Sequence, residues 1–129
     1  MQEDPEQREI ADKMLKAIEK KYGAIPFVNQ VTSQRPDIFI PSVKYSKAVL
    51  EVEEALDKKT RCLIAVGAAT ALGGQYCVNV QMEHAVQYGA TKDEVFEAIM
   101  IGSYMAMTRA QSYALREFDK KFPHDKIEE

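Results

Sequence analysis

Apolar residues recur at intervals of three and four along most of the chain, which is the spacing of one face of an α-helix. The first such stretch covers residues 5–22. Pro5 suits its first turn, where a missing N–H breaks no hydrogen bond, and Gly23 is expected to end it. The apolar face of this helix consists of Ile10, Met14, Leu15, Ile18 and Tyr22.

Prolines divide the region that follows. Residues 24–35 contain Pro26 and predict a short helical turn. From Pro36 the apolar pattern resumes as a helix that reaches about Glu54. Pro41 is expected to interrupt or kink this helix, because proline removes an N–H and its ring crowds the preceding turn.

The second half of the chain predicts a helical hairpin. Asp57 is the expected N-cap of a helix that is rich in Ala and Gly and runs to Leu72. Gly73-Gly74 breaks it, and a helix over residues 75–88 follows, ended by Gly89.

A further helix is expected after this hairpin. The pattern Thr91-Lys92-Asp93-Glu94 is typical of a capping box. Gly102-Ser103 is a weak point at which this segment could divide from the final helix, which ends near Phe122. Alternating strand patterns are nearly absent, so the sequence predicts an all-α protein.

Length and composition narrow the class of protein. The chain has 129 residues, 46% of them hydrophobic, which suits a single domain over residues 1–129 with a real core. Its net charge of −3 gives no reason to expect a nucleic acid or a membrane as partner. No apolar run approaches the ~20 residues of a membrane span, and the N-terminus does not resemble a secretory signal. Two cysteines without a disulfide framework fit the reducing cytoplasm.

Cys77 is the residue with the most reactive chemistry. It lies about three residues into the helix that starts after Gly74, where backbone N–H groups and the helix dipole favour a thiolate. Gln81 lies one turn further on the same face and could donate a hydrogen bond to the sulfur. The competing interpretation is that Cys77 is a small buried apolar residue, as free cysteines usually are.

Cys62 and His84 are the other polar candidates. A hairpin with its corner at Gly73-Gly74 puts Cys62 near Gln81 and His84 but ~12 Å from Cys77 along the axis, which is too far for a disulfide. Cys62 is therefore expected to pack in the core. His84 lies about 10 Å from Cys77, so it could act only through a water-bridged relay by way of Gln81, and a surface or partly buried histidine without a catalytic role is favoured. Cys62, Cys77 and His84 lack the closeness and the fourth ligand of a zinc site, so no metal or cofactor is predicted.

Residues 25–120, and most clearly residues 56–100, resemble a known family. Three stretches carry the likeness, namely LDKKTRCLIAVGAA, GGQYC and HAVQYGATKDEVFEAI. They are similar to the conserved helices of the carboxymuconolactone decarboxylase family, which includes alkylhydroperoxidase D. The resemblance implies an all-α helical array that assembles as a homo-oligomer, a trimer or a hexamer. The Ala/Gly-rich helix of residues 63–72 and the Met-rich residues 100–107 would fit the contacts between its subunits.

The peroxidase-type members of this family carry the motif E-x11-C-x2-C-x3-H. Without gaps, its glutamate falls on Cys62, its two cysteines on Gly74 and Cys77, and its histidine on Gln81. In the family the second cysteine is the nucleophile, the first resolves its oxidised form, and the glutamate and histidine relay protons. Only the nucleophile, Cys77, is retained here.

Three functions remain open at this point. The first is one-cysteine thiol redox chemistry of the peroxidase type at Cys77, with an external thiol as reductant. The second is a cofactor-free decarboxylase or isomerase for a small carboxylate or lactone, with Cys77, Gln81 and His84 lining a pocket and Arg109 facing inward. The third is a catalytically silent oligomeric binding protein.

Overall fold

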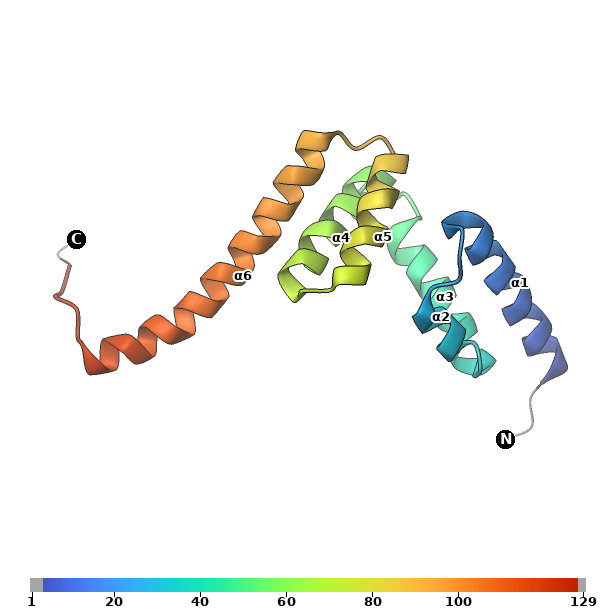
Figure 1. The fold of residues 1–129 in the computed structure, drawn as a ribbon, viewed down its shortest axis with the longest axis horizontal. Helices are drawn as coiled ribbons and strands as arrows, with labels where there is room; N and C mark the ends of the chain where they lie inside the picture. The colour runs from blue at the N-terminus through green and yellow to red at the C-terminus, as the bar shows by residue number, and fades with distance from the viewer. Residues whose placement is uncertain (1–3, 128–129) are drawn as a thin grey trace. The chain divides into compact units, whose positions relative to one another are not determined.

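The computed structural model describes residues 4–127, and every regular element in that range is an α-helix (Figure 1). The all-α prediction is therefore confirmed. Contacts along the chain divide it into two compact units, Met1–Val52 and Glu53–Glu129. Each unit has its own core and is described by itself.

The first unit is built on an amphipathic helix, α1 (Pro5–Tyr22), which packs against α3 (Pro36–Leu50). Asp4 caps α1 by accepting a hydrogen bond from the N–H of Glu6 at 2.9 Å. Gly23 ends the helix as predicted, at a φ of 79° that favours glycine. The core of this unit consists of Ala11, Phe39, Ile40 and Val43, with Met14, Leu15 and Ile18 packed against it.

The proline-marked region follows the prediction in its first part and differs from it in α3. A short helix, α2 (Phe27–Thr32), forms the expected turn. However, α3 runs through Pro41 without interruption and ends at Leu50, four residues before the predicted end. Pro41 is exposed and lies near the start of the helix, so it removes one hydrogen bond and its ring stays outside the core.

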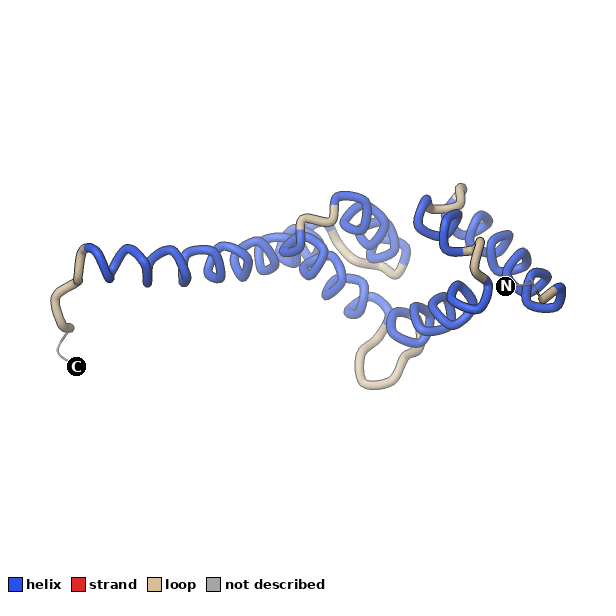
Figure 2. The backbone as a smooth tube through the Cα atoms, turned by 90° about the horizontal axis from the view of Figure 1, so that it is seen from below, coloured by secondary structure: helices blue, strands red, loops and turns tan. Residues whose placement is uncertain are grey.

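The second unit begins with the predicted hairpin of α4 (Lys58–Leu72) and α5 (Gln75–Gln87), seen from another side in Figure 2. Asp57 caps α4 by accepting the N–H of Thr60 at 2.8 Å. Gly73 makes the corner at a φ of 73°. The core of this unit consists of Cys62, Ala85 and Val95, with Leu63, Met82, Tyr88, Ala90 and Ile99 packed against it.

A single long helix, α6 (Lys92–Lys121), follows, so the predicted weak point at Gly102-Ser103 does not divide it. Gly102 instead marks the closest approach of α6 to α4. A Cβ atom built on Gly102 would lie 2.1 Å from the carbonyl oxygen of Gly67. The glycine is required by packing, because only a residue without a side chain lets the two backbones come this close.

The start of α6 is held by the predicted capping box. The N–H of Glu94 donates to Thr91 Oγ1, and the Glu94 carboxylate accepts the N–H of Thr91 at 2.9 Å. The same carboxylate pairs with Lys59 of α4 at 2.9 Å. The backbone N–H of Thr91, and after it Lys59, hold the pKa of Glu94 below its usual value.

We expect the Glu94→Gln variant to be less stable than the wild type at neutral pH, by a margin that disappears in acid. A carboxylate with a lowered pKa in the folded state stabilises the fold above its unfolded pKa, and this contribution is lost as the pH falls through the folded pKa. The urea midpoints of the two proteins should therefore converge between about pH 5 and pH 3. In a Lys59→Met background, the loss of stability caused by Glu94→Gln should become smaller but should not vanish, because the N–H of Thr91 still donates to the Glu94 carboxylate. A margin that widens in acid would contradict this assignment.

Candidate functional site

The Cys77 thiol lies in the first turn of α5. Gly74 is the N-cap of this helix, and Cys77 is its third residue. The side chain is exposed and forms no disulfide. The interpretation of Cys77 as a buried apolar residue is therefore wrong, because the first turn of α5 does not pack into the core.

Gly74 lies directly beside this thiol. A Cβ atom built on Gly74 would lie 3.5 Å from Cys77 Cβ and 3.9 Å from Cys77 Sγ. The first distance is within the range that disulfides require between their Cβ atoms. The backbone thus keeps the spacing of a cysteine pair, while the residue at position 74 supplies no second sulfur.

Gln81 follows Cys77 by one turn of α5. Its side-chain oxygen Oε1 is buried, and within residues 4–127 no group donates a hydrogen bond to it. Buried acceptors are normally satisfied, so an oxygen of this kind is suited to accept a hydrogen bond from water or from a bound molecule. Gln81 therefore supplies an acceptor at the position where the family motif has its histidine, but it takes up no proton at neutral pH.

Cys62 and His84 lie in the interior of the second unit. Cys62 is 1% exposed and packs with Ala85 and Val95, as expected for a core residue. Its burial keeps it from serving as a resolving thiol for Cys77 in the folded protein, and no disulfide joins the two cysteines. His84 is 4% exposed, so the prediction of a surface or partly buried histidine is wrong.

An apolar depression of the second unit is separate from Cys77. It is a groove of about 570 Å³ between α4 and α6. Ile64 and Ala68 line it from α4, and Ile101, Gly102 and Met105 line it from α6. The sequence indicated these two segments as contact surfaces through their small and Met-rich residues, but the groove itself appears only when α4 and α6 pack together.

Across residues 4–127, no three His, Cys, Asp or Glu side chains gather closely enough to hold a metal ion. Within the same range, no helix combines the length and the apolar composition needed to cross a membrane.

Comparison with known proteins agrees with this geometry. The chain is 33% identical over 66 residues to "Uncharacterized protein 4 in cox locus" from Paracoccus denitrificans. The match covers 51% of this chain and 60% of that protein, so the chain spans somewhat more than half of the length of its relative. No solved structure matches. The profile of the carboxymuconolactone decarboxylase family matches residues 36–120, most of the chain, and the protein therefore belongs to this family.

Proposed function

We propose that the protein is a one-cysteine thiol oxidoreductase that reduces a peroxide through Cys77. The observation that carries this proposal is the exposed thiol in the first turn of α5, at the nucleophile position of the family motif. Its neighbour at the resolving position is Gly74, so the thiol that completes the cycle must come from another molecule.

The proposed cycle has three balanced steps. The Cys77 thiolate attacks one peroxide oxygen, the O–O bond breaks, and an alcohol leaves after taking up a proton. Cys77 becomes a sulfenic acid, oxidised by two electrons. A first external thiol then displaces water and forms a mixed disulfide, and a second external thiol releases Cys77 as a thiolate together with a disulfide of the two reductant molecules.

Three features of the site support this chemistry. The first turn of a helix favours a negative charge, and this suits the thiolate and the sulfenate. The exposure of Cys77 leaves its sulfur open to attack by an external thiol. The acceptor oxygen of Gln81, one turn away, could hold the proton of a hydroperoxide or of the sulfenic acid. A reducing compartment such as the cytoplasm would provide the thiol.

The proposal predicts that hydrogen peroxide converts Cys77 to a sulfenic acid that dimedone traps. In the Cys62→Ala variant, mass spectrometry should find the adduct on Cys77, and peroxide consumption should require an added thiol. The Cys77→Ser variant should fall to the rate of the uncatalysed reaction, while Cys62→Ala alone keeps its activity. A Cys77 that reacts with iodoacetamide or peroxide no faster than a free cysteine at any pH would refute the proposal.

The alternative is a catalytically silent binding protein. It is favoured by the loss of three of the four motif positions, Cys62, Gly74 and Gln81, together with the apolar groove between α4 and α6. It predicts that Cys77→Ser leaves the biological role intact. The decarboxylase or isomerase hypothesis receives less support. It expects Arg109 to face inward as a cation, but Arg109 is exposed on α6.

Family membership also supports assembly as a homo-oligomer, a trimer or a hexamer, as part of this proposal. The exposed apolar residues of α4 and α6, among them Ile64 and Ile101 at 55% and 65% exposure, are suited to contacts between copies.

A further inference from the structure

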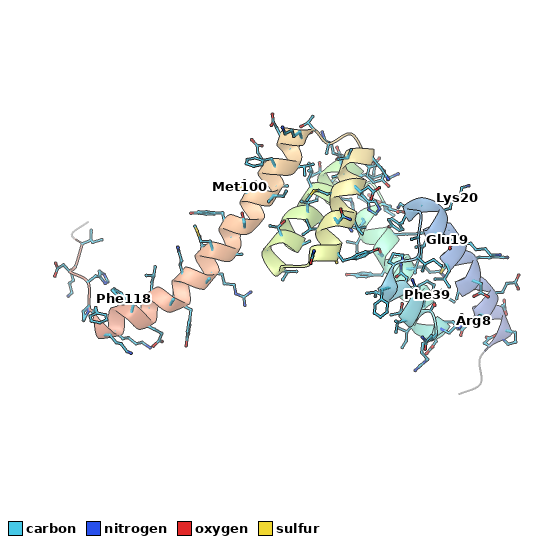
Figure 3. All side chains as sticks on the ribbon, in the orientation of Figure 1. Arg8, Glu19, Lys20, Phe39, Met100 and Phe118 are labelled. Atoms are coloured by element: carbon cyan, nitrogen blue, oxygen red, sulfur yellow. The ribbon has the colours of Figure 1, made fainter. Side chains whose placement is uncertain are left out.

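The second half of α6, residues 103–121, is called the arm here. No other helix of its unit buries any of its residues. None of its residues is buried, although all of them are described. Figures 1 and 2 show it extending away from α4 and α5, and Figure 3 shows Phe118 near its far end. The arm is a regular helix nevertheless.

Apolar side chains run along one face of α6 and continue onto this arm. At alternating steps of three and four residues they form a stripe, defined here as Ile101, Tyr104, Thr108, Gln111, Leu115, Phe118 and Phe122. Its five apolar members are between 57% and 65% exposed. This is the seven-residue spacing by which two helices pack along a seam, with two polar positions at its centre.

An exposed stripe of large apolar side chains indicates an interaction surface. We propose that the stripe packs against the same stripe of a second copy of this chain, antiparallel, around a two-fold axis between Arg109 and Ala110. This inference rests on the homo-oligomer proposed above and identifies its pairing surface.

The polar centre of the stripe specifies the register. Around this axis Thr108 of one copy meets Gln111 of the other, so the polar side chains meet each other and not apolar ones. On either side, Tyr104 then meets Leu115, and Ile101 meets Phe118. A shift by one heptad would place polar side chains against apolar ones, which is unfavourable.

Charge favours the antiparallel direction. The first part of α6, residues 92–102, contains Lys92, Asp93, Glu94 and Glu97 and has a net charge of −2. The arm contains Arg109, Arg116, Lys120 and Lys121 against Glu117 and Asp119 and has a net charge of +2. An antiparallel pair therefore places each basic arm beside the acidic half of the other helix, whereas a parallel pair would place like charges together.

The groove between α4 and α6 completes the surface. It shares Ile101 with the stripe, and in the proposed register Phe118 of the second copy lies opposite Ile101. The aromatic ring would thus enter the groove beside Ile64 and Ala68. Each half-exposed large side chain contributes about 100 Å² of buried area, so the four apolar members that meet in pairs bury roughly 800 Å² over the two copies. The groove adds further area toward the ~1,200 Å² of the smallest specific interfaces, and Phe122 lies opposite Glu97 in this register.

The first test is the molar mass in solution, measured by light scattering after size exclusion. The wild type should contain an even number of chains, and Leu115→Glu and Phe118→Glu should each lower the mass at least about twofold. Tyr113→Glu is the matched control, because Tyr113 is also aromatic and 72% exposed but lies on the opposite face of the arm. It should keep the wild-type mass.

The outcomes separate this inference from the assembly proposal. A monomeric wild type overturns both. A wild-type trimer, or an oligomer that Leu115→Glu and Phe118→Glu leave intact, overturns only the pairing of α6. A second measurement places no charge on the stripe. In a Cys62→Ala, Cys77→Ser background, a mixture of Thr108→Cys and Gln111→Cys chains should form disulfide-linked dimers of one chain of each kind. Preferential linkage of like chains would indicate parallel pairing and overturn the proposed axis.

Discussion

The Gly102→Ala variant should be destabilised by about 3 kcal/mol, although alanine normally stabilises a helix relative to glycine by about 1 kcal/mol. The added Cβ would lie 2.1 Å from the carbonyl oxygen of Gly67 and 2.8 Å from its carbonyl carbon. Both atoms belong to the backbone of α4, so no side chain can rotate away. The helices must separate, and the core around Cys62 and Val95 would open with them.

Urea unfolding followed by circular dichroism at 222 nm measures this loss. Two control variants make the same change of side chain in other settings. Gly67→Ala places a Cβ 3.1 Å from the Ala98 oxygen and should cost less. Gly74→Ala meets atoms no nearer than 3.5 Å, so it should lose only the preference of an N-cap for glycine over alanine, about 1 kcal/mol or less. If Gly102→Ala is as stable as Gly74→Ala, then α4 and α6 do not pack as closely as described.

The Gly74→Cys variant should form a disulfide with Cys77 on mild oxidation. The Cβ positions at 74 and 77 are 3.5 Å apart, at the lower end of the disulfide range, and the φ of Gly74 at −79° is accessible to any residue. The new thiol would also change the chemistry, because it could resolve a Cys77 sulfenic acid within the same chain. Peroxide reduction should then proceed with a dithiol reductant through an intramolecular disulfide in place of a mixed one.

Counting of free thiols, with Cys62→Ala as background, gives the direct measurement. The reduced protein should have two reactive thiols and the oxidised protein none, with a mass lower by two hydrogen atoms. Gly74→Ser is the matched control, since it adds a similar side chain that cannot bond to sulfur. Oxidised Gly74→Cys that keeps both thiols would show that the first turn of α5 does not hold the two positions at the described spacing. The disulfide test is independent of catalysis, so it stands or fails separately from the proposed peroxidase activity.

The two variants act on opposite properties of glycine. At position 102 glycine is required, because the backbone of α4 occupies the place of a side chain. At position 74 a side chain would fit without a steric conflict. The glycine there only deprives the site of a reactive group. The sequence alone did not distinguish these cases, and Gly102 was interpreted from it as a weak point within a helix.

Local signals predicted most of the helices. The caps at Asp57 and Thr91 and the stops at Gly23, Gly73 and Gly89 lie where the sequence placed them, because each acts through hydrogen bonds or dihedral angles within a few residues. The errors came where distant contacts or exposure decide. Pro41 did not interrupt α3, and the Gly102 position of α6 is fixed by its contact with α4.

The candidate site follows the same division. The motif spacing predicted that Gly74, Cys77 and Gln81 lie within two turns of one helix start, and they do. Which side chains of α5 are buried depends on the face by which the helix packs. This applies to the exposure of Cys77, the burial of His84 and the buried acceptor oxygen of Gln81. The thirteen residues of α5 do not determine that orientation by themselves.

By itself, the sequence determined the all-α class, the helix limits set by caps and glycines, and the retention of a single motif cysteine, because these depend on neighbouring residues. Only the tertiary structure decided that Cys77 is accessible, that His84 is interior, and that α6 continues past its last contact with α4 as an uncovered arm. Burial is a property of surfaces brought together from separate parts of the chain, and the same apolar spacing describes a helix face whether its partner lies in the same chain or in another copy.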